Sequence, residues 1–307
     1  MHPFRFAVQV SGANSGPRWR DLARQIEDLG YSALFMPDHL DEQWSPLVAL
    51  TVAAEVTTTV RIGTLVLGND YRHPVVLARE AATLELLSEG RLELGLGAGW
   101  MTSDYEQAGI DLDPPAVLID RLGEAVTIVK ELWREGSCHY LGDHYRPNGV
   151  SGYPAPRSGP ALLIGGGSRR VLTLAGREAD IVGVNPRLTA GFIGPEMIAS
   201  ALPEAYDQRL AWVREGAGDR FEELELQCLT FLVRVVDNGR QLVEELAPAF
   251  QMTVDQAADA PVALIGTVDE IVGTLQARRR RWGLSYWVVH QAELEDFAPV
   301  VARLAGT

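Results

Sequence analysis

The chain has 307 residues, with 27 basic and 41 acidic side chains and a formal net charge of −14. A surface this acidic repels nucleic acids and anionic membranes, and no tract of about 20 apolar residues predicts a membrane span. Two cysteines exclude a disulfide framework, and no histidine or cysteine spacing matches a metal site. No signal-like segment follows Met1, so we expect a soluble, cytoplasmic protein that binds neither nucleic acid nor membrane.

The first half of the chain alternates strands and helices joined by short connections. Strand patterns fall at residues 4–10, 33–36 and 61–67, and a fourth alternates along Leu92, Leu94 and Leu96. Helical spacing falls at residues 19–29, 45–58 and 73–87, and we expect Gly30 to end the first helix, Ser45 to begin the second and His73 to cap the third. This alternation is typical of a parallel sheet covered by helices.

The second half continues the alternation with longer excursions. Strands are predicted at 161–164, 180–185, 225–236 and 286–290, and helices at 117–133, from Ser168 to about Gly176, 196–213, 241–260, 267–282 and the C-terminus. The helix at 241–260 is weakly amphipathic and is a candidate mobile lid. The basic run Arg278–Arg281 is interpreted as a solvated helix end.

Eight such units without an internal repeat predict a single-domain (β/α)8 TIM barrel over residues 1–307. We expect insertions after strands 4, 6 and 7, with the first two at about 101–160 and 186–218. An open, doubly wound sheet is the alternative architecture.

The most unusual stretch is the fourth predicted strand with its exit, Arg91 to Trp100. Glycine replaces a side chain at Gly95, Gly97 and Gly99, although glycine inside a strand loses packing and conformational entropy. This pattern indicates that something approaches the backbone closely. The alternative is a strand that simply leaves its sheet through a glycine-rich loop.

A barrel places function at the carboxyl ends of its strands. The side chains and turns predicted there are Asp38, His39, Asn69, Ala98, Gly99, Trp100, Gly165–Ser168, Asn185 and His290. His39 is a candidate acid or base tuned by Asp38, but a direct pair requires the strand to have ended before them, and a structural pair is the alternative. His290 either points into the mouth or only ends its strand.

The turn Gly165–Ser168 precedes a helix and so presents backbone N–H groups to an anion. Arg169 and Arg170 follow in the first helical turn, where cations oppose the helix dipole. A bound phosphate that neutralises them would explain their placement. Two solvated arginines after a plain glycine turn are the alternative.

Taken together, the ordered motifs resemble the luciferase-like monooxygenase superfamily, and within it the coenzyme F420-dependent oxidoreductases of actinobacterial type. The matching segments are Ile26–Tyr31, Pro37–His39, Arg61–Thr64, His73–Val75, Gly90–Trp100, Leu163–Gly167 and Ala179–Gly183. The resemblance implies a TIM barrel that binds a flavin or deazaflavin at the strand ends, commonly with a non-prolyl cis peptide that would fall at Leu65–Val66.

By this resemblance the bulge at Leu65–Val66 backs the central ring, Ala98 and Gly99 let it lie against strand four, Gly166–Ser168 hold the phosphate and Asn185 flanks the ring. The cofactor-binding residues so predicted are Leu65, Val66, Asn69, Ala98, Gly99, Gly165, Gly166, Gly167, Ser168 and Asn185.

Members of the family that oxidise sugar phosphates carry an Asp-His pair on strand two and a catalytic Glu on strand four. Asp38 and His39 match the pair, but Trp100 stands where the Glu would be. This departure argues against sugar-phosphate oxidation. It leaves His39 as the candidate proton donor or acceptor, with Asp38 beside it and Trp100 walling the substrate pocket.

We therefore expect hydride transfer between F420 and an activated C=C, C=N or carbonyl group of a small organic molecule. An FMN-dependent monooxygenase using O2 is the closest rival, and a non-catalytic accessory barrel subunit is a rival of another class. A lyase or hydrolase would need a carboxylate pair or metal cluster that the sequence lacks. Family analogy implies a homodimer.

Overall fold

This computed structural model describes residues 1–157, 159–188 and 200–307. Within them, eight parallel strand positions close into a barrel in chain order, the third being divided into two short strands. The barrel strands are β1 (Arg5–Gln9), β2 (Ala33–Met36), β3 (Arg61–Thr64) with β4 (Leu67–Gly68), β5 (Leu92–Gly97), β8 (Ala161–Gly166), β9 (Ile181–Val184), β10 (Glu225–Leu229) and β13 (Leu284–His290). β1 pairs with both β2 and β13, so the first and last strands complete the ring. The predicted (β/α)8 TIM barrel is confirmed and the open sheet is excluded.

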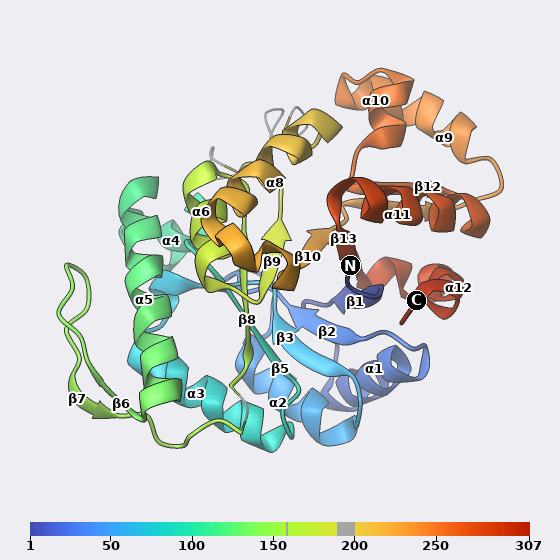
Figure 1. The fold of residues 1–307 in the computed structure, drawn as a ribbon. Helices are drawn as coiled ribbons and strands as arrows, with labels where there is room; N and C mark the ends of the chain where they lie inside the picture. Colours follow the sequence, from blue (N-terminus) through green and yellow to red (C-terminus); the bar gives the residue numbers. More distant parts are fainter. Residues whose placement is uncertain (158, 189–199) are drawn as a thin grey trace.

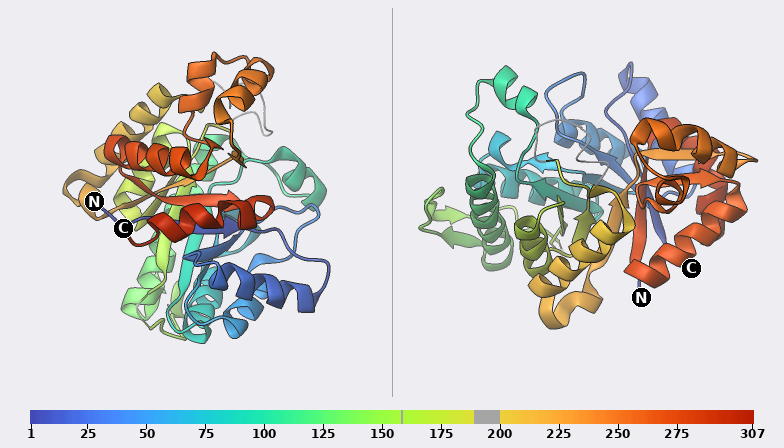
Figure 2. Two further views of the ribbon diagram at one scale, coloured as in Figure 1. Left: turned by 90° about the vertical axis from the view of Figure 1, so that its right-hand side faces the viewer. Right: turned by 90° about the horizontal axis from the view of Figure 1, so that it is seen from above.

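Helices cover the outside of this ring (Figure 1, Figure 2). They are α1 (Gly16–Asp28), α2 (Pro46–Val56), α3 (Pro74–Leu87), α5 (Pro115–Glu135), α6 (Arg169–Glu178), α8 (Pro203–Ala217), α11 (Val268–Trp282) and α12 (Leu294–Leu304). Ser45 and His73 occupy the expected N-cap positions, but only His73 makes a capping bond, which it accepts from the Val75 N–H. Thr267 forms a capping box with Glu270 at the start of α11. The predicted start of the helix at 196–213 lies outside the described residues.

Two apolar clusters show how the strands divide their side chains. The larger cluster lies between the strands and the surrounding helices. The smaller one includes Ala7, Phe35, Leu163 and Val288, which alternate with the outward-facing residues and fill the barrel interior. Alternation along each strand therefore decides which residues reach the barrel mouth.

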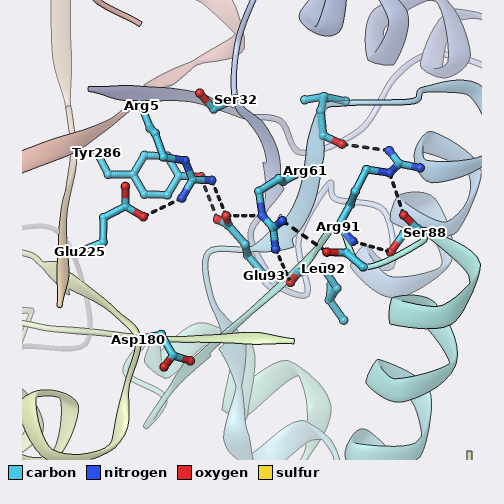
Figure 3. Close-up of polar contacts among 12 residues, drawn as sticks. Arg5, Ser32, Arg61, Ser88, Arg91, Leu92, Glu93, Asp180, Glu225 and Tyr286 are labelled. Carbon is cyan, nitrogen blue, oxygen red and sulfur yellow. Dashed lines mark hydrogen bonds and ion pairs between the residues drawn. The ribbon is translucent and has the colours of Figure 1, made fainter. Parts of the chain in front are cut away.

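The amino end of the barrel is closed by charged side chains (Figure 3). Glu93, 1% exposed, forms ion pairs with Arg5 and Arg61 and accepts a hydrogen bond from the Tyr286 hydroxyl at 2.8 Å. Arg5 also pairs with Glu225 at 2.6 Å. Burial, with the Glu93 charge, raises the pKa of Tyr286 well above its usual range. Because these charges compensate one another, the network supports the barrel rather than forming a ligand site.

The predicted seventh strand, 225–236, is wrong in its second half. The chain leaves the barrel after β10, and β11 (Leu232–Val235) pairs instead with β12 (Ala263–Gly266) in a separate two-stranded parallel sheet. β12 was not expected from the sequence. An apolar run predicts that a strand is buried, but it does not show which sheet the strand joins. The pattern over 225–236 therefore did not reveal that the chain changes sheet.

The segment predicted as one helix at 241–260 is divided into α9 (Gly239–Leu246), η3 (Ala247–Phe250) and α10 (Val254–Asp259). These pieces lie together at one side of the molecule beside β12 (Figure 1). Pro248 explains the break, because proline lacks the N–H that a continuous helix needs.

The basic run is also partly reinterpreted. Arg278 is buried, and its guanidinium donates hydrogen bonds to the carbonyls of Pro261, Ala263 and Ala260. It therefore fixes the chain before β12 and is not part of a solvated helix end.

The remaining elements are short. They are η1 (Asn69–Tyr71), α4 (Thr102–Ala108), the antiparallel hairpin of β6 (Ser137–His139) and β7 (Asn148–Ser151), η2 (Gly218–Glu223) and η4 (Gln291–Glu293). The hairpin projects away from the barrel (Figure 1). None of the helices in the described ranges is long and apolar enough to cross a bilayer.

Candidate active site

The third barrel strand is interrupted at the mouth of the barrel, between β3 and β4. The peptide bond between Leu65 and Val66, which lies between β3 and β4, is cis, as the family resemblance implies. The Gln9 side-chain amide donates a hydrogen bond to the Leu65 carbonyl at 2.8 Å and ties the bulge to β1. Val66 is left partly exposed at the mouth.

The glycines of β5 make room for this bulge. A Cβ at Gly95 would lie 2.0 Å from the Thr64 carbonyl oxygen, and one at Gly97 would lie 2.6 Å from a Val66 methyl. The close approach indicated by the sequence is therefore real, but the neighbouring strand makes it. No ligand is needed to explain the missing side chains at these two positions.

Gly99 is required for a different reason. Its φ of +91° lies in the region that favours glycine, and a Cβ there would meet the Tyr105 hydroxyl at 1.9 Å. Ala98 and Trp100 on either side are half-buried. The exit of β5 thus carries one small and one large side chain at the mouth.

Three of the predicted cofactor residues, Val66, Gly165 and Asn185, converge at the mouth from three different barrel strands. A Cβ at Gly165 would lie 3.3 Å from the Asn185 amide nitrogen and 3.4 Å from a Val66 methyl. Gly165 is itself only partly covered. The result is a floor without a side chain at Gly165, bordered by one apolar group and one amide, which suits a flat heterocycle with polar edges.

After the end of β2, His39 forms a dyad with a carboxylate that the sequence did not reveal. His39 Nδ1 lies 2.7 Å from Asp104 Oδ2, and Asp104 Oδ1 accepts a hydrogen bond from the Leu40 N–H. Asp104 stands in the first turn of α4 and is 2% exposed. The Trp100 ring stands perpendicular to the imidazole, with the ring centroids 5.7 Å apart.

Asp38 does not pair with His39. Its carboxylate accepts hydrogen bonds from Arg72 at 2.5 Å and from the Gly68 N–H at 3.1 Å. Asp38 therefore joins the end of β2 to β4, while His39 turns toward α4. The predicted Asp38–His39 pair is corrected on this point: neighbours along an extended chain face opposite sides.

Further polar groups hold the carboxylates near the mouth. Tyr71 donates a hydrogen bond to Asp104 at 3.3 Å, and Tyr105 donates one to Asp70 at 3.0 Å. Arg121 forms an ion pair with Asp70 at 2.9 Å. Burial and these carboxylates raise the pKa of both tyrosines above their usual range, so their hydroxyls stay protonated.

Asn69 and His290 complete the strand ends. Asn69 is buried and donates a hydrogen bond to the Tyr145 hydroxyl at 3.2 Å. His290 begins η4 in a capping box with Glu293. His290 is also the register partner of Gln9 on β1 and follows the interior residues Tyr286 and Val288, so it faces the mouth by alternation.

The turn after β8 forms as expected, but its arginines are paired. Ser168 occupies the N-cap position of α6 without a side-chain capping bond. Arg169 forms an ion pair with Glu215 at 2.8 Å, and Arg170 forms one with Asp120. The hypothesis that a phosphate is needed to neutralise these two arginines is therefore wrong, since side chains distant in the sequence already do so.

A model of the luciferase-like monooxygenase family matches residues 1–258 of the chain. The chain belongs to this family.

Curated relatives of this luciferase-like chain include the F420-dependent glucose-6-phosphate dehydrogenases of Microbacterium testaceum and Nakamurella multipartita. The first is 30% identical over 68% of this chain and 63% of its own length, and the second is 31% identical over 73% and 66%. The chain thus spans just under two thirds of the length of these relatives. The F420-dependent hydroxymycolic acid dehydrogenase of Mycobacterium tuberculosis is 30% identical over 52% of this chain and 46% of its own length.

Solved structures of the same fold cover 99% of this chain. The coenzyme F420-dependent tetrahydromethanopterin reductase from Methanopyrus kandleri has a TM-score of 0.77 at 17% identity, over 99% of its own chain. A long-chain alkane monooxygenase has a TM-score of 0.78 at 14% identity, over 91% of its own chain. At such identities the likeness establishes the fold alone.

The luciferase-like chain thus gathers most of its sequence-predicted site residues at one mouth, and it adds Asp104, Gln9 and Tyr71. Asp104 carried a weak signal: an acidic residue in the first turn of a helix directly after a strand end. Gln9 is the last residue of the first strand and faces the interior by alternation. No group of three or more metal-ligating side chains is found in the described parts of the chain.

Proposed function

We propose that this chain is an F420-dependent oxidoreductase that transfers a hydride between the deazaflavin and a small organic molecule. The observation that carries the proposal is the convergence of Val66, Gly165 and Asn185 around a surface without a side chain. The His39–Asp104 dyad after the end of β2 supplies a group that can handle a proton. The F420-dependent curated relatives support the choice of cofactor.

The residues present fit such a group. In the proposal the Leu65–Val66 bulge backs the ring, Ala98 and Gly99 line the strand-four side, Asn69 and Asn185 flank it, and the turn Gly165–Ser168 receives the phosphate. When bound, the deazaflavin supplies the hydride donor or acceptor. The protein binds it, orients it and handles the proton.

The proton is assigned to His39. Because the Asp104 carboxylate accepts a hydrogen bond only, it selects the form of His39 that carries hydrogen on Nδ1. The other ring nitrogen, Nε2, is then the group that gives or takes a proton. Asp104 takes the orienting role that the sequence reasoning assigned to Asp38.

The substrate proposed is an activated C=C, C=N or carbonyl compound rather than a sugar phosphate. Trp100 presents an aromatic surface next to His39, where the resemblance places a catalytic carboxylate in sugar-phosphate-oxidising members. An aromatic wall favours apolar or planar substrates. Trp100 therefore shapes the pocket in this proposal.

Titration of the purified protein with F420 and with FMN, followed by fluorescence, tests the cofactor. We expect saturable binding of F420 and much weaker binding of FMN. Tight binding of FMN without a response to F420 would support the flavin-dependent monooxygenase instead. Binding of neither cofactor would support a non-catalytic accessory barrel.

We also propose that the chain acts as a cytoplasmic homodimer. Four large apolar side chains on the neighbouring helices α2 and α3 are exposed: Val48, Val76, Leu86 and Leu87. A second copy would cover them, since such patches commonly mark interfaces. Light scattering should give twice the chain mass, and Val76→Glu should lower it to that of one chain.

A further inference from the structure

We propose that Arg209 is a positioning residue for the turn after β8, and that its uncompensated charge makes this turn selective for ligands that carry a phosphate. The inference deepens the proposed function, on which it rests for the identity of the cofactor. It names the side chain behind the turn that favours an anion, in place of Arg169 and Arg170.

Arg209 is a buried cation for which the described part of the chain offers no counter-ion. It lies on α8, is 2% exposed, and its Nη1 has no hydrogen-bond partner among those same residues. In residues 1–157, 159–188 and 200–307 no carboxylate lies within ion-pair distance of it, whereas Arg169 and Arg170 are both paired. A buried charge is costly unless it is paired, so a nearby anion would offset part of that cost.

The surroundings of Arg209 do not neutralise it. Its guanidinium carbon lies 5.2 Å from the centre of the Tyr206 ring, which attracts the cation without removing its charge. Burial lowers the pKa of Arg209, Tyr206 opposes that shift and the charge of Arg187 adds to it. An arginine nevertheless stays protonated in proteins, so the site keeps its positive charge.

Arg209 contacts the turn directly. Its Nε donates a hydrogen bond to the Gly167 carbonyl at 3.3 Å. In a trans peptide the carbonyl and the following N–H point in opposite directions, so this bond directs the Ser168 N–H away from Arg209. The turn is also packed closely against the segment after β9, because a Cβ at Gly167 would lie 2.5 Å from the Pro186 carbonyl oxygen and 2.6 Å from that of Asn185.

The turn therefore has the two properties that an anion site needs. The first N–H groups of α6, which follow Ser168, lack partners within their helix, and the Ser168 side chain does not cap them. Behind them lies a fixed positive charge that water cannot screen well. We infer that the phosphate of the cofactor side chain occupies the turn and that Arg209 contributes to its affinity.

The test compares two ligands that differ in the phosphate: F420 and its phosphate-free deazaflavin chromophore. Affinities are measured by fluorescence titration for the wild type, Arg209→Met, Arg209→Lys and the matched control Arg169→Gln. We expect Arg209→Met to bind F420 about tenfold to a hundredfold more weakly while its affinity for the chromophore stays within about twofold of the wild type. The control variant should match the wild type for both ligands.

A second measurement does not depend on the cofactor. Inorganic phosphate should raise the melting temperature of the wild type and of Arg169→Gln, and should not raise that of Arg209→Met. Equal stabilisation of the wild type and Arg209→Met, or an unchanged ratio between the two deazaflavins, would overturn the proposal. If wild type binds neither deazaflavin, the proposed function fails, while the phosphate measurement still decides the role of Arg209.

Arg209→Lys covers the case in which the methionine variant does not fold. Lysine keeps the positive charge, but it lacks the planar guanidinium whose Nε donates to the Gly167 carbonyl while the other nitrogens extend beyond it. We expect its preference for F420 over the chromophore to fall several-fold below that of wild type. A preference equal to that of wild type would contradict the positioning role.

Discussion

His39 and Asp104 are 65 positions apart in the chain, and their side chains meet at 2.7 Å at the mouth of the barrel. β2 ends just before the histidine, and α4 begins just before the aspartate. His39 therefore lies in the connection that follows β2, and the carboxylate from α4 orients its imidazole.

Asp104→Asn should lower the rate of hydride transfer without abolishing cofactor binding. Asparagine can offer its NH2 group to His39 Nδ1 and so favour the wrong tautomer, which removes the defined proton at that nitrogen. We expect kcat with the best substrate from a panel to fall about tenfold to a hundredfold, with a changed pH profile. Tyr71→Phe removes only a 3.3 Å contact to Asp104, so its kcat should fall by less than threefold. Equal losses in both variants would contradict the orienting role.

Trp100 should exclude sugar phosphates from the reaction. The wild type is expected to show no reduction of F420 with glucose 6-phosphate, because an aromatic ring stands where the resemblance places a carboxylate. Trp100→Phe should keep activity on the preferred substrate within about tenfold, since the aromatic wall remains. Rapid reduction of F420 by glucose 6-phosphate in the wild-type protein would refute the substrate assignment.

Gly95→Ala should destabilise the barrel. The new methyl would lie 2.0 Å from the Thr64 carbonyl oxygen, which is backbone and cannot move aside. We expect a loss of about 3 kcal/mol in the free energy of unfolding. Gly273→Ala is the matched control: this exposed glycine lies inside α11 with nothing within 4 Å, so alanine should stabilise by about 0.5–1 kcal/mol. Urea unfolding measures both, and a tolerated Gly95→Ala would show that the bulge is not packed as described.

Glu93→Gln should cost stability without affecting the mouth. Removing this charge leaves Arg5 and Arg61 without their shared buried partner, which typically costs about 3–5 kcal/mol. Asp120→Asn breaks the exposed pair with Arg170 and should cost less than about 1 kcal/mol. Because the network lies at the amino end of the barrel, the affinity for F420 should stay unchanged in both variants. If fully folded Glu93→Gln bound F420 more weakly, the network at the amino end of the barrel would be coupled to the mouth, contrary to this prediction.

Glu27 should contribute stability that disappears in acid. Burial opposes ionisation, but hydrogen bonds from the backbone of Thr59, Val60 and Thr58 outweigh it and lower the pKa of Glu27 to about 2. A carboxylate with a depressed pKa stabilises the fold above its unfolded pKa of about 4.3, and the contribution is lost as pH falls toward 2.

Glu27→Gln should therefore be less stable than the wild type at pH 6, by about 1 kcal/mol once solvent screening is allowed for. The difference should shrink between pH 4 and pH 3 in urea unfolding. A difference that is the same at pH 6 and pH 3 would show that the charge of Glu27 contributes nothing.

Most of the architecture was decided by the sequence alone. Alternating apolar runs and helical periods identify the barrel strands and helices, because burial on one or both faces is a local property of each segment. The strand-end rule then places His39, Trp100, Gly165 and Asn185 at one edge without any coordinates. The cis peptide at Leu65–Val66 came from the family resemblance, and no local pattern predicted it.

Only the tertiary structure decided which groups pair. Asp38 is adjacent to His39 in the sequence, yet Asp104 is its partner, because side-chain direction depends on where β2 ends and how α4 packs. In the same way Glu215 and Asp120 pair with Arg169 and Arg170, and within the described ranges Arg209 has no carboxylate partner. Hydrogen bonds and ion pairs act over about 3–4 Å in space, and distance along the chain does not determine them.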